Sequence, residues 1–577
     1  MLAKGISSLA LLILVPLCLT SAATETDLQL GKAEEGTLSA GKADSYVLTL
    51  RSGDLVETNV VTHGTKLLVT VYGPSGSKTR GFRFNGPGRK IDFVAEDPGR
   101  YRLEVAINGK ANDGPYTITL MRIIALMTQA PVAEKYESPR IKALRTALDG
   151  GQQNAVATFW NEVKDRGAPL IEPLEGDEKN MLVTFLWRGT ADTKNVGVVW
   201  FPFSLYWPDN YQMSRLGETD IWCKTVKVDK RKRFNYQLAL NAPPLHASQE
   251  PVGDDTYIVL EATSRLDPLN PKHWLADPES PDAPQYQGVS VVEMPDAPVQ
   301  PWLAQRQGIP AGSVEKHQFD SVLLKNTREV AVYIPPGYSK DAKPYGLIVL
   351  FDERAYLNDK AHGTIVPTPI ILDNLIAEKR IPPLIALLID NPSGDTRSRE
   401  LPCNTKFEDF LSFELLPWAH RSYNITSDPS RTVVGGASYG GLAAACAGLY
   451  HSETFGNILS QSGSYWWTPP RSDNPNDFDP AAEPNWVAKQ FIVSPKLPLR
   501  FYLDAGSDEV DYTGRGGDIL VTSRHLRDIL IAKGYEVHYQ EFSGGHDFLS
   551  WRGTLADGLI LLMGTNLDRE QASVYKH

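Results

Sequence analysis

The sequence predicts a multidomain chain in which two β-sandwiches precede an α/β domain with a mainly parallel sheet. The chain has 577 residues, which is too long for one hydrophobic core at roughly 100–200 residues per domain. Short strands separated by turns fill the first half of the chain, whereas strands alternating with helices follow from about residue 313. These two patterns are typical of sandwiches and of layered α/β domains, respectively.

Residues 1–23 are expected to form a cleaved signal peptide. Lys4 supplies a positive charge, Ile6–Leu19 is an apolar run, and Ser21–Ala23 offers small residues for cleavage. The run is shorter than the roughly 20 apolar residues of a membrane span. We therefore expect a periplasmic or secreted protein without a membrane span.

Residues 24–125 are expected to form the first β-sandwich. Alternating strands are predicted at Ser45–Leu50, Lys66–Tyr72, Lys90–Val94 and Tyr101–Val105. Gly-Pro, Ser-Gly and Asn-Gly turns separate them, as in sandwich folds. No residue here indicates chemistry, so we expect a passive appendage, with a binding module as the alternative.

Residues 135–305 are expected to form a second domain, which begins with two helices. Ser138 and Pro139 are suited to the start of a helix, and a second helix is predicted over Asn154–Val163, ending before Gly167. An immunoglobulin-like sandwich should follow. Its predicted strands are Leu182–Trp187, Val196–Trp200 and Tyr257–Glu261. The Pro-rich stretch Pro295–Pro310 marks the boundary.

Residues 313–577 are expected to form the α/β domain. Its strands read as continuous apolar runs, as buried parallel strands do. The predicted strands are Tyr345–Phe351, Leu384–Ile389, Thr432–Val434, Asn457–Leu459, Leu499–Leu503 and Glu536–Tyr539.

The motif Gly436-Ala437-Ser438-Tyr439-Gly440 lies between a predicted strand and a predicted helix, Leu442–Leu449. This context is that of the nucleophile elbow of an α/β-hydrolase, in which glycines permit a tight turn. Ser438 is therefore the candidate nucleophile. One oxyanion-hole N–H should come from Tyr439 and the other from the loop after an early strand, where Arg354 is preferred to Glu353.

A serine nucleophile needs a general base and a carboxylate that orients the base. Of the 11 histidines, His546 lies in a Gly-rich loop after the last predicted strand, where the base of an α/β-hydrolase is found. The acid should follow the penultimate strand. Glu509 is the first candidate and Asp508 the second, whereas Asp504 is expected to end the strand.

The net charge and the cysteine content argue against nucleic-acid-binding, disulfide-rich and metal-binding proteins. The formal charge is −11 and becomes −12 once Lys4 is removed with the signal peptide, which argues against nucleic acid as a partner. Cys223, Cys403 and Cys446 remain and allow at most one disulfide. No metal-binding spacing is present, and ester hydrolysis of this kind needs no cofactor.

The sequence resembles the enterochelin (enterobactin) esterase family over roughly 138–577. The segments that carry the resemblance are Phe159-Trp160, Pro169–Pro173, Asp267–Pro271, Arg399–Asn404, Glu414–Pro417, Ser460–Trp467, Gly544–Asp547 and Trp551–Gly553. The resemblance implies hydrolysis of the ester bonds of cyclic catecholate siderophores, which releases iron. Typical intracellular members lack the first sandwich and the signal peptide.

A ferric catecholate is anionic, so a basic patch should offset the acidic chain if such a substrate is bound. Arg397 and Arg399 follow one strand, and Arg354 and Arg552 lie near the expected site. Trp466 and Trp467 could stack on catechol rings. Two rival hypotheses remain, namely an esterase of feruloyl or acyl-glycan substrates and a catalytically silent siderophore-binding protein. Intact candidates for every catalytic role argue against the second. The sequence does not give the oligomeric state.

Overall fold

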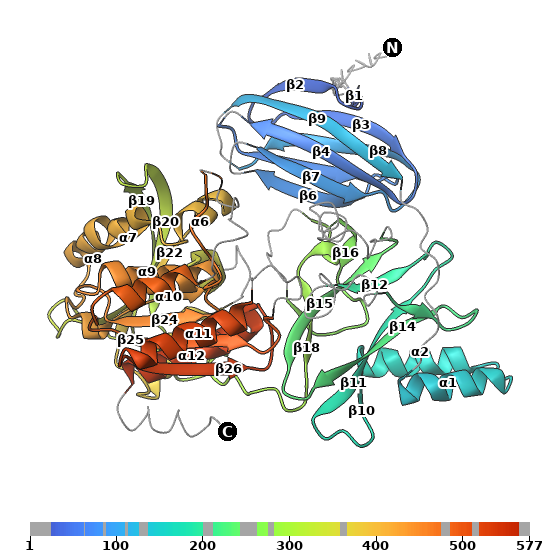
Figure 1. Cartoon of the computed structure of the whole chain (residues 1–577). Helices are drawn as coiled ribbons and strands as arrows, with labels where there is room; N and C mark the ends of the chain where they lie inside the picture. Colours follow the sequence, from blue (N-terminus) through green and yellow to red (C-terminus); the bar gives the residue numbers. More distant parts are fainter. Residues whose placement is uncertain are drawn as a thin grey trace, which may run out of the picture.

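The computed structural model describes residues 25–62, 64–84, 88–109, 113–125, 137–199, 212–242, 262–274, 282–357, 366–472, 474, 485–510 and 518–564. They form three units, with the first sandwich against the second unit and the second beside the α/β unit (Figure 1). The expected signal peptide and the expected strand Tyr257–Glu261 lie outside the described residues. No helix in the described ranges is long and apolar enough to cross a membrane.

The first unit consists of two sheets that enclose one core. Its strands are β1 (Glu25–Asp27), β2 (Ala33–Leu38), β3 (Ala43–Leu50), β4 (Asp54–Thr62), β5 (Leu67–Tyr72), β6 (Lys78–Phe84), β7 (Gly88–Val94), β8 (Gly99–Ile107) and β9 (Gly114–Ala125). The sheets have the orders β1-β3-β8-β5-β6 and β2-β9-β4-β7. Alternate side chains of both sheets, among them Val56, Val69 and Leu103, are fully buried between them.

The second unit begins with the two predicted helices. Its elements are α1 (Pro139–Asp149), α2 (Ala155–Arg166), β10 (Leu170–Pro173), β11 (Asn180–Arg188), β12 (Val196–Val199), β13 (Ser214–Arg215), β14 (Ile221–Asp229), β15 (Arg233–Leu240), β16 (Ser264–Arg265), β17 (His273–Trp274), η2 (Pro284–Tyr286) and β18 (Val289–Glu293). The Ser138 hydroxyl accepts the Ile141 N–H and caps α1, and α2 ends at Gly167, whose φ is 81°. Both helix predictions are confirmed.

The strands of the second unit form two further sheets. One has the order β10-β11-β14-β13, and the other contains β12-β15-β18-β17 with β16 beside β15. Phe185 of the first sheet and Phe234 of the second share one core. Phe159 and Trp160 of α2 cover the opposite face of the first sheet. Whether this pair of sheets is immunoglobulin-like stays a prediction.

The third unit is built on one eight-stranded sheet with the order β19-β20-β22-β21-β23-β24-β25-β26. The strands are β19 (Ser313–Ser321), β20 (Asn326–Ile334), β21 (Gly346–Phe351), β22 (Leu384–Ile389), β23 (Thr432–Ala437), β24 (Asn457–Gln461), β25 (Arg500–Gly506) and β26 (Glu536–Phe542). From β22 to β26 all neighbours are parallel, whereas the β19–β20 hairpin is antiparallel. The mainly parallel sheet is confirmed.

Helices cover both faces of this sheet and bury two separate cores. The helical segments are α4 (Glu353–Tyr356), α5 (Thr368–Ala377), α6 (Gly394–Glu400), α7 (Thr405–Asp409), the π-helical η3 (Phe410–Leu415), α8 (Leu416–Ser422), η4 (Pro429–Arg431), α9 (Tyr439–Tyr450), α10 (Trp486–Val493), α11 (Ile519–Ala532) and α12 (Phe548–Met563). One core contains residues of α7 to α11 and the other contains residues of α5 and α12. Strands β21 to β24 are therefore buried on both sides.

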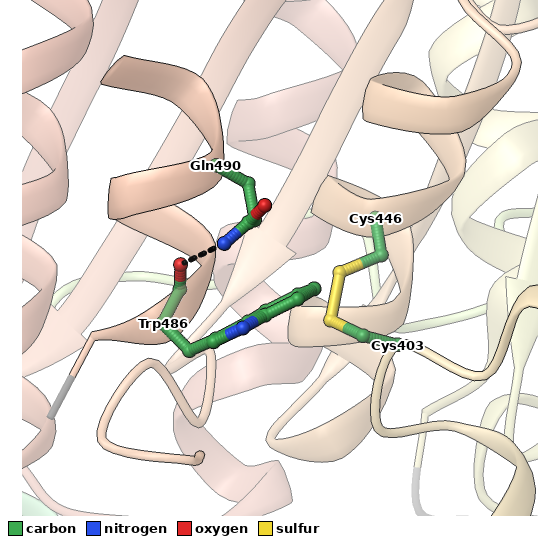
Figure 2. Close-up of a disulfide and its surroundings, with 4 residues drawn as sticks. All are labelled: Cys403, Cys446, Trp486 and Gln490. Atoms are coloured by element: carbon green, nitrogen blue, oxygen red, sulfur yellow. Dashed lines mark hydrogen bonds between the residues drawn. A yellow bond between two sulfur atoms is a disulfide. The ribbon is translucent and has the colours of Figure 1, made fainter. Parts of the chain in front are cut away.

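A disulfide joins Cys403, which follows α6, to Cys446 in α9 (Figure 2), with a Cα–Cα distance of 5.4 Å. Trp486, the first residue of α10 and also drawn in Figure 2, packs against the hydrophobic core that contains both cysteines. The bond fastens the segment after α6 to the helix that follows the candidate nucleophile. It is the one disulfide that the cysteine count permitted.

Candidate active site

The nucleophile elbow is the point at which β23 turns into α9. Ser438 has φ 60° and ψ −121°, a conformation that L-residues rarely adopt and that marks functional turns. A Cβ on Gly436 would lie 3.0 Å from the backbone of Gly440, so the turn requires glycine there. The tight turn exposes the Ser438 side chain at the carboxyl edge of the sheet, as the motif predicted.

The loop between β26 and α12 brings His546 to Glu509. Nδ1 of His546 lies 2.5 Å from Oε1 of Glu509, and the Glu509 side chain is only 1% exposed. The second carboxylate oxygen of Glu509 accepts the N–H of Gly506 at 2.5 Å. The indole of Trp551 packs edge-on against the imidazole, with 4.8 Å between ring centroids. Both the carboxylate and the ring are thus held in one orientation.

Asp508, the alternative acid, has a different partner. Its Oδ1 accepts a hydrogen bond from Nζ of Lys232 at 2.8 Å, and Nζ lies 2.6 Å from Oδ2. Lys232 belongs to the second unit, in the turn between β14 and β15. The geometry therefore favours Glu509 over Asp508 as the partner of His546.

Ser438 and His546 line one cavity of about 660 Å³. The Ser438 hydroxyl lies 3.3 Å from the hydroxyl of Ser464, and the described residues show no direct hydrogen bond between Ser438 and His546. Catalytic hydrogen bonds are often long before substrate binds.

Of the two oxyanion-hole candidates, Arg354 lines the cavity, and Tyr439 directly follows Ser438, which lines it. Tyr439 is the first residue of α9 and Arg354 the second of α4, so neither N–H has an acceptor within its own helix. Asp352 precedes α4 in the left-handed region, with φ 59°. The Arg354 side chain is half exposed, and its guanidinium pairs with Asp390 at 3.0 Å. Burial raises the pKa of Asp390, and the pairing with Arg354 opposes this increase.

The two arginines after β22 differ in their placement. Arg397 lines the cavity and holds Asp352 through two hydrogen bonds of 2.7 and 2.8 Å. Its guanidinium lies 5.8 Å from the centre of the Tyr439 ring. Arg399 is exposed and is not among the residues that line the cavity. The prediction that both arginines face the substrate is therefore supported for Arg397 alone.

The two tryptophans are also separated. Trp467 is buried in the core and packs edge-on against Trp486 at 5.7 Å, so the expectation that it stacks on substrate is wrong. Trp466 is partly buried and lies 6.0 Å from the Tyr439 ring. Neither indole lines the cavity. Adjacent residues after a strand point in different directions, which explains why only one of them approaches the elbow.

Two buried carboxyls lie close to the site. Burial raises the pKa of Asp504 to about 8, although hydrogen bonds from Thr554 and from the Ser462 N–H oppose the increase. Burial likewise raises the pKa of Asp547, which caps α12 and lines the cavity, to about 7. Asp504 lies two residues before the end of β25, which runs to Gly506, so the expectation that it ends the strand is wrong; it is fully buried and does not line the cavity.

Sequence reasoning missed the contribution of the second unit to this cavity. Its lining includes four residues of the second unit, namely Asn235, Trp274, Gly288 and Val289. The guanidinium of Arg552 lies over the Trp274 ring, 4.6 Å from its centre. Arg552 therefore links the α12 side of the cavity to the second unit. Trp274 closely follows the Asp267–Pro271 segment, but no local pattern indicates that its side chain reaches a distant serine.

Comparison with known proteins places this chain in a family. The family described as "Putative esterase" matches residues 321–562, and the enterochelin esterase N-terminal family matches residues 182–303. The iron(III) enterobactin esterase of Dickeya dadantii is 31% identical over 435 residues, which cover 72% of this chain and 94% of that protein. The chain belongs to the enterobactin esterase family.

Other members of the family agree with this result. The iron(III) salmochelin esterase of Escherichia coli O6:H1 is 30% identical and is matched over 98% of its length, with 74% of this chain covered. The crystal structure of the ferric enterobactin esterase from Salmonella typhimurium superposes with a TM-score of 0.56 at 27% identity, covering 70% of this chain and 98% of that one. The protein is a carboxylic ester hydrolase of the enterobactin esterase type.

Proposed function

We propose that this enterobactin esterase relative hydrolyses the ester bonds of a catecholate siderophore through an acyl-serine intermediate. Ser438 Oγ attacks the ester carbonyl while His546 takes its proton and then gives it to the leaving alcohol. Water, activated by the same imidazole, attacks the acyl-serine and releases the acid. Glu509 orients the imidazole, and the N–H groups of Tyr439 and Arg354 bind the oxyanion.

The observation that carries the mechanism is the His546–Glu509 hydrogen bond facing the same cavity as Ser438. Ser438, His546 and Arg354 line this cavity, and Glu509 contacts His546, so each role expected of a serine esterase has a residue in the cavity or next to it. These intact roles count against a catalytically silent binding protein.

The composition of the cavity supports an aromatic substrate. Trp274 and Trp551 supply aromatic surface, whereas the cationic side chains Arg354 and Arg397 are paired with Asp390 and Asp352, which line the cavity too. The relatives matched over nearly their whole length are iron(III) enterobactin and salmochelin esterases. Cleavage of such a siderophore would weaken its hold on iron, so we propose iron release as the outcome.

We further propose that the protein acts in the periplasm or outside the cell. The Cys403–Cys446 disulfide is typical of an oxidising compartment. The apolar run at the N-terminus agrees with export.

The test compares enterobactin, its ferric complex and a feruloylated sugar as substrates for the wild type and Ser438→Ala. We expect the wild type to cleave enterobactin with the highest kcat/KM, and Ser438→Ala to lose on the order of 10⁶ in kcat. More than a few per cent residual activity in the variant would exclude Ser438 as nucleophile. Preference for the feruloyl ester would reassign the substrate and leave the mechanism intact.

A further inference from the structure

The loop that carries Glu509 is fastened to the loop that carries His546 by backbone hydrogen bonds. The Ser507 N–H donates to the carbonyl of Phe542, and the Asp508 N–H donates to the carbonyl of Gly544, both at 2.9 Å. The acid loop, Ser507–Glu509, and the histidine loop, Ser543–His546, are therefore joined directly through the main chain. An interaction that holds the Asp508 side chain in place therefore restrains both loops.

A residue of the second unit makes such an interaction with Asp508. Lys232 Nζ holds the Asp508 carboxylate at 2.6 and 2.8 Å, and the two side chains are only 16% and 15% exposed. The backbone of Lys232 is itself fixed, because its N–H donates to Asp229 and its carbonyl accepts from Met294. A pair this far from solvent is screened little by salt, and removal of one partner leaves a mostly buried charge without its counterion.

The next residue, Arg233, is the first of β15 and makes a second connection to the active-site side of the α/β unit. Arg233 binds Glu293 at 2.6 Å, and Glu293 lies 3.6 Å from Arg552. Arg552 is in α12, which begins two residues after His546, and its Nε donates to Gln300 at 2.7 Å. The second unit thus contacts the chain on both sides of the histidine.

We propose that Lys232 is a positioning residue for the hydrolytic reaction, acting through Asp508 to keep the Glu509 carboxylate on His546. The inference rests on the proposed function of Ser438, His546 and Glu509. Under this proposal the second unit contributes to the chemical step and also lines the cavity. Asp508 and Glu509 then have separate tasks, since one anchors the loop and the other orients the base.

The test measures kcat and KM for a nitrophenyl ester in Lys232→Met, Lys232→Arg, Asp508→Asn and the double variant Lys232→Met/Asp508→Asn. We expect Lys232→Met to lower kcat about 10-fold with KM within about 3-fold of the wild type, and Lys232→Arg to keep most of the activity. The double variant should lose no more than the worse single variant, because both changes break one interaction. Lys230→Met, in the same turn, is the matched control and should leave kcat unchanged.

Labelling of Ser438 by a fluorophosphonate gives a readout that does not depend on substrate binding. The labelling rate should fall in Lys232→Met. Measuring it at a temperature well below the melting transition of each variant separates a loss of positioning from a loss of fold. Additive losses in the double variant, or a normal kcat in Lys232→Met, would overturn the proposal. If Lys232→Met does not fold, Asp508→Asn with the wild-type labelling rate would overturn it equally. A wild type without esterase activity would instead contradict the proposed function.

Discussion

Glu509 and Asp508 are neighbours in sequence, yet only Glu509 contacts His546. We expect Glu509→Gln to lower kcat by about 10³–10⁴, because an amide cannot stabilise the imidazolium and disturbs its tautomer. Asp508→Asn should cost much less. Steady-state kinetics of the two variants check this order, and the reverse order would assign the orienting role to Asp508.

Asp504 is a buried carboxyl whose pKa is raised by burial to about 8, from about 3.9 in an unfolded chain. The folded state therefore binds one more proton than the unfolded state between these limits. The free energy of unfolding should fall as pH rises through this window, by up to about 1.4 kcal/mol per pH unit. Asp504→Asn, which keeps an acceptor for the Ser462 N–H, should remove that dependence.

Chemical unfolding of the wild type and Asp504→Asn at pH 5 and pH 8.5 measures this difference. The wild type should lose stability relative to the variant on going to pH 8.5. A constant difference between the two proteins would show that Asp504 does not change its protonation in this range.

At the scale of elements, the disulfide closes a chain segment whose ends are 43 residues apart in sequence. Cross-links of this length contribute about 4 kcal/mol in the chain-entropy description, and measured values are often smaller. We expect Cys403→Ser/Cys446→Ser to lower the melting temperature by several degrees. Calorimetry with and without dithiothreitol measures the effect, and reductant should destabilise the wild type but not the double variant.

The segment that ends at Cys403 also contributes a residue to the cavity. Arg397 in α6 lies six residues before Cys403 and holds Asp352 at the start of α4. Nearby, the fully buried guanidinium of Arg328 pairs with Glu400 at 2.7 Å. The segment after β22 is thus anchored at both ends, and this arrangement fixes the side of the cavity that carries the Arg397–Asp352 pair.

At the scale of the whole molecule, the first sandwich is attached to the second unit by a mostly buried ion pair. Arg80 in β6 binds Asp282 at 2.9 Å and lies 4.8 Å from the ring centre of Tyr286. We expect Arg80→Ala to cost about 1–3 kcal/mol, because it removes the guanidinium that binds the mostly buried Asp282 carboxylate. Calorimetry should then resolve a separate, earlier transition of the first sandwich.

Arg102→Ala is the matched control for Arg80→Ala. Arg102 pairs with Glu104 and stacks on Tyr72 within the first sandwich, so its loss should not separate the two units. A single transition in both variants would show that Arg80 does not couple them. Hydrolysis of a small nitrophenyl ester should be unchanged in both.

Trp274 tests the contribution of the second unit to the cavity. We expect Trp274→Ala to raise KM for an aromatic acyl ester at least about 5-fold, because the ring supplies apolar surface to the cavity that Ser438 also lines. Trp274→Phe should keep most of the affinity. Parallel measurements with an acetyl ester, which has no ring to stack, should show little change; equal losses for both esters would point to a collapsed cavity.

The sequence by itself determined the features that depend on local chemistry. The continuous apolar runs predicted the buried parallel strands, and the glycines around Ser438 predicted a turn that only small residues permit. The Gly-rich loop after the last strand predicted the place of His546. Strand ends of a parallel sheet lie at one edge, so local motifs in the right order were enough to bring serine, histidine and acid together.

Tertiary structure decided the features that depend on side-chain direction and on contacts between units. Asp508 and Glu509, like Trp466 and Trp467, have similar local sequence contexts, and only the packing around them turns one toward the site and the other elsewhere. No sequence pattern indicated that Trp274 and Lys232 lie against the α/β unit either. Such contacts join residues more than 200 positions apart, and they depend on the docking of two folded surfaces, which leaves no periodic pattern in either segment.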